Sequence, residues 1–168
     1  KTLPYLARDR FTHFRMDDRF TVHHTFVRRS NYYAAFNVGE VLAPMQRYGL
    51  GLLWHPGMGS LLQTQSREVG PWGTASDGAD VYEAEVFEPD MRMNGDVFLP
   101  VSGRQDLGEG ELTFVYQLGE HGQKVVRFAE DYIEVTVDHA GAFVEHLPLL
   151  VRTSDELTVQ DHQICLIR

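Results

Sequence analysis

Residues 47–66, RYGLGLLWHPGMGSLLQTQS, decide the fold class of this chain. Two short apolar runs flank a turn built on Pro56, Gly57 and Gly59. Pro56 fixes φ at the second position of a turn, and Gly57 can adopt the positive φ that a type II turn requires at the third. Residues 55–58 are therefore predicted to form a type II turn, with 61–65 returning as the second strand of a β-hairpin.

The first strand of this hairpin is expected to have two unlike faces. Leu50, Leu52 and Trp54 share one face at the two-residue period of a β-strand, and we expect them to join the protein core. Gly49 and Gly51 leave the other face almost bare, so another backbone or an aromatic ring can approach it closely.

Strand patterns recur along most of the remaining chain. Runs rich in β-branched and aromatic residues alternate apolar with polar positions, and turn-forming residues separate them. No stretch keeps the spacing of an amphipathic helix without interruption. The predicted strands beyond the hairpin cover residues 19–28, 31–38, 81–88, 96–101, 111–118, 123–130, 132–138, 142–151 and 156–167.

The segments between these strands carry further signals. Asn94 and Gly95 form a strong two-residue turn signal. Residues 66–80, rich in Gly, Pro, Ser and Asp, are predicted to be a long loop that Trp72 anchors to the body. Core-facing positions are predicted at Leu112, Phe114, Tyr116, Leu118, Ile133, Val135 and Val137. We predict an all-β antiparallel β-sandwich of roughly ten to twelve strands with little helix, formed by residues 1–168 as one domain.

Composition limits the classes of partner. The net charge is −9, although residues 1–30 hold seven Lys or Arg against three Asp. The acidic remainder argues against nucleic-acid binding, which needs a basic face. No apolar run approaches the length of about 18 residues that a membrane helix needs, and the single Cys165 has no partner for an intramolecular disulfide. The absence of an initiator Met and a signal peptide predicts a trimmed chain or a mature fragment, in which Lys1 could follow a further domain.

Polar and aromatic residues on the strands before the hairpin form a candidate site. His23 and His24 are adjacent, so a strand directs them to opposite faces and they cannot both ligate one metal ion. One of them, with Asn31, Tyr32 and Tyr33, could take a proton next to a carboxylate and stabilise the resulting enolate. The alternative is that these residues pack against neighbours or line the rim of a sheet.

Metal and cofactor signals are missing from the sequence. No HxH, HExxH or CxxC spacing occurs, so we predict neither a zinc site nor a cofactor. An acidic stretch lacks the EF-hand pattern and is predicted to be a solvated edge, with a calcium site assembled from loops as the alternative. Its members are Asp77, Asp80, Glu83, Glu85, Glu88 and Asp90.

Three stretches resemble a known family. They are RFTVHHTFVRRSNYYAAFNV at residues 19–38, GLGLLWHPGMGSLLQTQS at 49–66 with the following Trp72-Gly73-Thr74, and VVRFAEDYIEVTVDHAGAFVEHLPLLV at 125–151. Together they look like the C-terminal β-sandwich of heparinase II/III-like polysaccharide lyases, in which a helical toroid precedes the sandwich. Such lyases cleave uronic-acid polysaccharides by β-elimination in the cleft between the two domains.

The resemblance implies an accessory domain that is inactive alone. In the family most catalytic residues come from the toroid, and the sandwich adds a His and often a zinc ion through a stretch resembling HxHxD. VHHTF, at residues 22–26, is the nearest approach and has a different spacing. The implied catalytic contributors are His23, His24 and Tyr33, and the implied contacts to an acidic polysaccharide are Arg28, Arg29, Asn31, Tyr32 and Trp72. A preceding helical domain and a secreted or periplasmic bacterial location are also implied.

Two other classes of function remain open. A carbohydrate-binding or adhesion sandwich would hold glycans through exposed aromatic residues such as Tyr33 and Trp72. A structural interaction module would cover a neighbouring domain, and it predicts an exposed apolar patch of several hundred Å².

Overall fold

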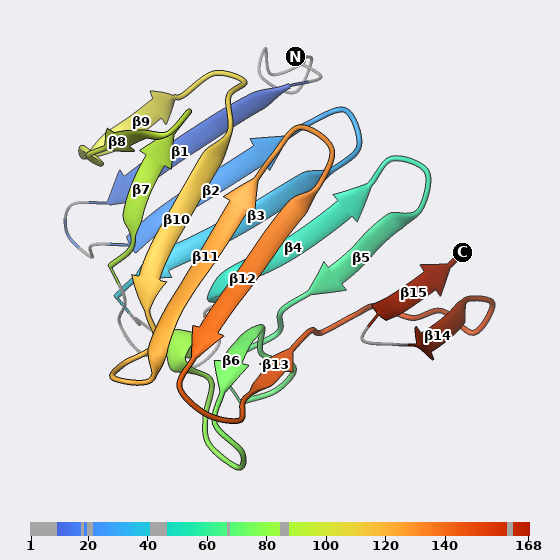
Figure 1. The fold of residues 1–168 in the computed structure, drawn as a ribbon. Coiled ribbons are helices and arrows are strands. Elements are labelled where there is room, and N and C mark those ends of the chain that lie inside the picture. The colour runs from blue at the N-terminus through green and yellow to red at the C-terminus, as the bar shows by residue number, and fades with distance from the viewer. Residues whose placement is uncertain are drawn as a thin grey trace.

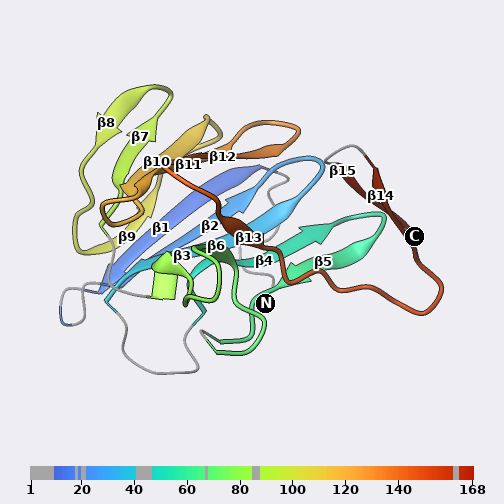
Figure 2. The ribbon, with the colours of Figure 1, turned by 60° about the horizontal axis from the view of Figure 1, so that its bottom comes forward.

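A computed structural model of the chain describes residues 10–17, 19, 22–40, 47–66, 68–84, 88–160 and 163–168. Within these ranges the protein is all-β, as predicted, with fifteen strands in antiparallel sheets. Two large sheets face each other in Figure 1, and Figure 2 shows them as two layers. Phe20 and His162, which belong to predicted strands, and Glu85, which belongs to the acidic stretch, lie outside the described residues.

The larger sheet has six strands and contains the hairpin of residues 47–66. Its strand order is β5-β4-β3-β2-β1-β9. The strands are β1 (Phe11–Asp17), β2 (Val22–Arg28), β3 (Tyr33–Gly39), β4 (Gly49–His55), β5 (Gly59–Gln63) and β9 (Gly103–Asp106). Consecutive strands are neighbours from β1 to β5, and β9 joins the free side of β1.

The second sheet has five strands, in the order β12-β11-β10-β7-β8. They are β7 (Asp90–Met93), β8 (Asp96–Phe98), β10 (Leu112–Gln117), β11 (Gly122–Phe128) and β12 (Ile133–His139). Two small sheets complete the fold, formed by β6 (Gly73–Ala75) with β13 (Val144–His146) and by β14 (Glu156–Gln160) with β15 (Gln163–Ile167). In both ribbon views the β14–β15 hairpin projects beyond β5, away from the two large sheets.

Several predicted segments differ from the structure. The strand predicted at 81–88 contains the short 3-10 helix η2 (Tyr82–Ala84), and the loop predicted at 66–80 contains β6. Residues 142–151 form only the three-residue β13, and 156–167 form a hairpin rather than one strand. The pattern did not indicate β1, β7 or β9. β7 and β9 have only four residues each, which are too few alternating positions to establish a period.

The turn of the central hairpin is present but has another geometry. The Met58 N–H donates to the His55 carbonyl at 3.2 Å, which closes the predicted four-residue turn. Gly57 is not at positive φ, whereas Gly59 has a φ of 77°. A turn followed by a left-handed glycine is the usual form of a three-residue hairpin loop, so the type II prediction is wrong.

The face prediction for β4 is wrong beyond Leu50. The ladder between β3 and β4 pairs Phe36 with Leu50 and Ala35 with Leu52, so the register shifts and Gly51 has no opposite residue. Such a bulge reverses which side chains point inward. Leu53 packs against the core instead, and Leu52 and Trp54 are only half-buried and lie outside the core cluster.

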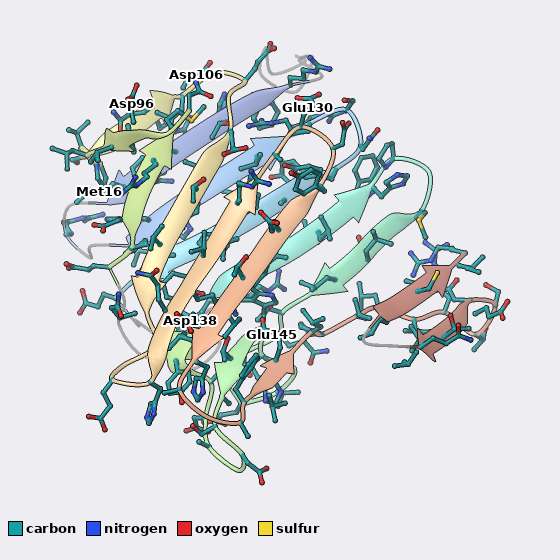
Figure 3. The ribbon with its side chains drawn as sticks, in the orientation of Figure 1. Met16, Asp96, Asp106, Glu130, Asp138 and Glu145 are labelled. Atoms are coloured by element: carbon teal, nitrogen blue, oxygen red, sulfur yellow. The ribbon has the colours of Figure 1, made fainter. Side chains whose placement is uncertain are left out.

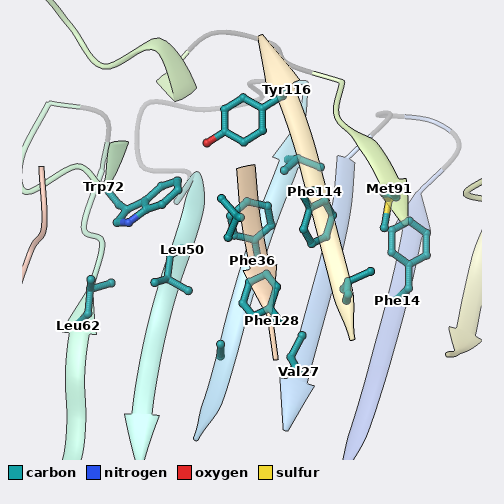
Figure 4. Close-up of a cluster of buried hydrophobic side chains, with 14 of the residues drawn as sticks. Phe14, Val27, Phe36, Leu50, Leu62, Trp72, Met91, Phe114, Tyr116 and Phe128 are labelled. Carbon is teal, nitrogen blue, oxygen red and sulfur yellow. The ribbon is translucent and has the colours of Figure 1, made fainter. Parts of the chain in front are cut away.

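Aromatic rings fill the space between the two large sheets (Figure 4). Phe36 lies 4.6 Å from Phe114 and 5.6 Å from Phe128, measured between ring centroids. The alternation of β10 is confirmed, because Leu112, Phe114, Tyr116 and Leu118 are all buried. Ile133, Val135 and Val137 pack against the same cluster from β12.

The close approach of an aromatic ring that was predicted for the glycines of β4 occurs at Gly49 but not at Gly51. Gly49 has a φ of 56°, and a Cβ on it would lie 2.1 Å from a carbon of the Trp72 ring. Trp72 is 1% exposed, so it anchors its segment to the body as expected. In the part of the chain that the structure describes, no helix has the length and apolar character needed to cross a bilayer.

Candidate binding face

The outer face of the six-stranded sheet collects three of the predicted site residues. Val27 and Ala34 point into the core, so neighbouring strand positions point outward. His24 and Arg28 on β2 and Tyr33 on β3 therefore share the outer face, where each is half-buried. The ladder pairs Arg28 with Tyr33 directly.

A row of side chains crosses this face from strand to strand. Phe11 pairs with Arg28, Arg28 with Tyr33, and Tyr33 with Trp54, so four adjacent strands each contribute one residue. Phe11 and Tyr33 approach to 6.4 Å between ring centroids in an edge-on arrangement. At about 4.8 Å between neighbouring strands the row spans about 14 Å. It offers one guanidinium and the half-buried rings of Tyr33 and Trp54, whereas the Phe11 ring is only 3% exposed and closes one end of the row.

Further basic groups lie on the same face, farther along the strands. Arg15 pairs with His24 and His24 with Asn37, whose side-chain oxygen lies 3.1 Å from His24 Nδ1. His13 Nε2 lies 3.8 Å from an Asp106 carboxylate oxygen. The outer face thus combines arginine, imidazole, amide and aromatic groups, which suit an anionic, hydroxyl-rich ligand.

The geometry does not support the predicted catalytic set of His23, His24 and Tyr33. His23 points to the core side, 5.5 Å from the Phe14 ring, and burial lowers the pKa of its imidazole. His24 pairs with Asn37, four residues along β3 from Tyr33, which is about 13 Å. Burial raises the pKa of Tyr33, so its phenol stays protonated and is a poor general base.

Three predicted contact residues are structural instead. Arg29 is 2% exposed and donates to the carbonyls of Phe11 and Gly110 and to the Thr12 hydroxyl. Tyr32 is 5% exposed, and its hydroxyl donates to the Ala129 carbonyl at 2.5 Å. Together with the buried Trp72, these side chains hold the sandwich together, and their positions leave no ring face or guanidinium free for a polysaccharide.

Asn31 belongs to a junction between two turns. Its amide donates to the Asp131 carboxylate at 3.1 Å, and the neighbouring Ser30 hydroxyl donates to Glu130 at 3.0 Å. Figure 3 places Glu130 at the opposite end of the molecule from Glu145. Asn31 therefore links the β2–β3 turn to the β11–β12 turn rather than lining the outer face.

A buried charged network near Glu145 was not predicted. Lys124 and Glu83 have fully buried side chains, and Lys124 Nζ lies 2.9 Å from Glu83 and 2.7 Å from Glu145. The same ammonium donates to the Thr74 hydroxyl and sits 3.8 Å from the centroid of a Trp72 ring. Glu83, predicted to lie on a solvated edge, is therefore an interior residue, and the prediction is wrong there.

Glu83 has partners for both carboxylate oxygens. Oε1 accepts from the Tyr116 hydroxyl at 2.8 Å and from Lys124, and Oε2 accepts from the Thr74 N–H at 2.9 Å. Burial, and then the adjacent Glu83 carboxylate, raise the pKa of Tyr116. This network ties β6, η2 and β13 to β10 and β11, so its role is structural. The sequence signal for this network was the position of Lys124. It lies two residues before the inward-facing Val126, so a strand directs its side chain to the same, inner face.

A second unpredicted cluster lies at the surface beside this network. The Ser76 and Tyr82 hydroxyl oxygens are 2.7 Å apart, and the Tyr82 oxygen is 3.2 Å from His139 Nε2. The rings of His121 and His139 stack at 5.5 Å. Among the described residues, no group of three or more His, Cys, Asp or Glu side chains could hold a metal ion.

Comparisons of the whole chain with protein-family models, with curated proteins and with solved structures find no match.

Proposed function

We propose that this β-sandwich is an accessory domain that binds an acidic, uronate-containing polysaccharide on the outer face of its six-stranded sheet and has no catalytic activity alone. The observation that carries the proposal is the row of half-buried Arg28, Tyr33 and Trp54 across three adjacent strands, which the buried Phe11 ring extends at one end. Flanking the cleft of a heparinase II/III-like lyase is the setting that the sequence resemblance suggests for such a face.

The chemistry of the row fits this ligand. A guanidinium presents a planar pair of N–H donors that matches a carboxylate, and aromatic rings offer flat apolar surfaces to the C–H faces of sugar rings. The outer face of the other sheet is different, because acidic and hydroxyl residues alternate along β12 at Glu134, Thr136 and Asp138. A polyanion is therefore expected to prefer the six-stranded sheet.

Isothermal titration calorimetry with alginate, heparin and chondroitin sulfate tests the proposal, with neutral dextran as a control. The variant Arg28→Gln/Trp54→Ala should lose at least tenfold in affinity, which corresponds to about 1.4 kcal/mol. Arg92→Gln/Tyr132→Ala is the matched control, because both residues are exposed and belong to the other sheet or its turns. The proposal would be contradicted if the wild type bound dextran as tightly as it binds the acidic polysaccharides, or if Arg28→Gln/Trp54→Ala bound alginate as tightly as the wild type.

The absence of activity is tested separately. Absorbance of the unsaturated product is followed while the isolated chain is incubated with the same three polysaccharides. Appreciable turnover would overturn the inactive assignment while leaving the binding face unaffected.

One observation favours a structural interaction module as a second candidate. The β14–β15 hairpin pairs Leu157 with Leu166 and Val159 with Ile164, which places four aliphatic side chains on one face. Val159 is 69% and Ile164 51% exposed. Two-stranded hairpins are marginally stable without further packing, so self-association of two copies through this face is the corresponding proposal. Sedimentation should then show a dimer that Val159→Lys abolishes, and a monomer at all concentrations would exclude it.

A further inference from the structure

The β4–β5 hairpin that carries Trp54 is held from outside its own sheet. The Gln63 N–H donates to the Pro148 carbonyl at 3.1 Å, and the Leu150 N–H donates to the Leu61 carbonyl at 2.8 Å. An isolated bridge joins Leu62 to Leu149. Residues 148–150 thus run antiparallel along β5 and pair with the edge that would otherwise be free.

One arginine then joins the far end of this segment to the hairpin turn. Arg168 Nη1 donates to the Met58 carbonyl at 2.6 Å and to the Ser60 carbonyl at 2.9 Å, and Nη2 donates to the Leu150 carbonyl at 2.5 Å. The side chain of Arg168 is only 6% exposed. Ser60 is the cross-strand partner of Trp54, so the guanidinium fixes the backbone opposite the last aromatic residue of the row.

Asp155 sets the orientation of this guanidinium. Its Oδ2 accepts from Arg168 Nε at 3.0 Å and Nη2 at 2.8 Å, and from the Arg152 N–H at 2.8 Å. The side chain of Arg152 donates in turn to the Met58 carbonyl at 3.2 Å. Because the Asp155 carboxylate holds one side of the planar Arg168 guanidinium, the remaining N–H groups of the guanidinium have fixed directions. They donate to the three backbone carbonyls named above.

We infer that Arg168 and Asp155 are positioning residues that hold the Trp54 end of the binding row in place. The inference deepens the proposed function and rests on it for its effect on ligand affinity. The β14–β15 hairpin shares no ladder with either large sheet among the described strands. The contacts of Arg168 with Asp155 and with the carbonyls of Met58, Ser60 and Leu150, called the clamp below, join it to the body. Without the clamp, the tip of β4–β5 and the segment along β5 lose their common anchor.

Acrylamide quenching of tryptophan fluorescence tests the clamp without any ligand. The chain has two tryptophans, and Trp72 is 1% exposed, so added quenching reports on Trp54. Arg168→Ala and Asp155→Asn should each raise the quenching constant by about twofold and speed amide exchange of Gln63 and Leu150, whose N–H groups form the bonds between β5 and this segment. Arg168→Lys keeps the positive charge but lacks the planar guanidinium, so its quenching constant and exchange rates should lie between those of the wild type and Arg168→Ala. The control Arg92→Gln should have the same quenching constant and exchange rates as the wild type.

Alginate affinity provides the second measurement. Arg168→Ala should weaken binding by about threefold to tenfold, with Arg168→Lys recovering part of the loss. Unchanged quenching and exchange in a folded Arg168→Ala or Asp155→Asn protein would overturn the inference. If the wild type binds no polysaccharide, the proposed function fails while the quenching and exchange results still decide whether the clamp positions Trp54.

Discussion

The interior of this protein contains two regions built in opposite ways. Between the large sheets, Phe36, Phe114 and Phe128 contact one another and need only to be apolar and well packed. Beside β6, Lys124 and Glu83 are equally buried, yet each polar atom has a partner at hydrogen-bond distance. The first region depends on buried area, and the second depends on complete pairing, so a single lost partner should matter more in the second.

Lys124→Met should give the largest loss of stability. The change removes the one cation between Glu83 and Glu145 and leaves two carboxylates without their counter-charge. The free energy of unfolding should fall by about 5 kcal/mol, measured in urea melts. Lys124→Met/Glu83→Gln should lose clearly less than the sum of the two single changes, because a neutral amide needs no counter-charge. Strict additivity would show that the network is not coupled.

Phe114→Ala tests the apolar region. Its ring is fully buried against Phe36 and Phe128, so truncation removes transfer free energy and leaves a cavity. A loss of about 3 to 5 kcal/mol is expected in the same urea melts. The control Val97→Ala, at a position 68% exposed, should change stability by less than about 0.5 kcal/mol. A loss below about 1 kcal/mol for Phe114→Ala would contradict the packing shown here.

Gly49→Ala tests the border between the two regions. The new methyl group would meet the Trp72 ring, and the positive φ of Gly49 disfavours any side chain. Overpacking and backbone strain together should lower stability by about 3 kcal/mol. Gly57→Ala is the matched control in the same hairpin, because its added Cβ would approach only the His55 ring, at 3.4 Å or more. Similar losses for both changes would argue against the Gly49 contact.

His23 gives the smallest expected effect and has a distinctive pH dependence. Burial lowers its pKa below the ordinary value, and within the described residues its buried Nδ1 has no hydrogen-bond partner. Protonation therefore favours the unfolded chain, so the free energy of unfolding should decline as pH falls below about 6.5. His23→Gln should reduce this decline in urea melts across pH 7.5 to 5.5. An identical pH profile for both proteins would exclude His23 as its source.

Sequence patterns predicted the structural features that depend only on residues close together in the chain. The alternation of β10 identified four core residues, and Asn94-Gly95 identified a turn in which both residues have positive φ. The bulge at Gly51 was invisible because it arises in the pairing with β3. Patterns also miss a buried lysine, because the inward position of Lys124 becomes acceptable only through Glu83, which lies 41 residues away in the sequence.

The binding face could be predicted only in part for the same reason. Arg28 and Tyr33 lie on either side of one turn, so their proximity follows from the hairpin pattern. Phe11 and Trp54 join them only through the registers of β1 with β2 and of β3 with β4, and the bulge decides which side of β4 Trp54 occupies. Arg29, beside Arg28 in the sequence, points to the other side and is buried.

The segment along β5 has a consequence for how the protein is made. The strands β1 to β5 of the large sheet are complete once Gln63 has been synthesised, but the residues that pair with the β5 edge begin at Pro148. Until then the nascent sheet presents an unpaired edge beside the apolar Leu61 and Leu62. A ribosome-bound chain that pauses between these two points should therefore need a chaperone, and shortened chains that stop before residue 148 should precipitate during expression.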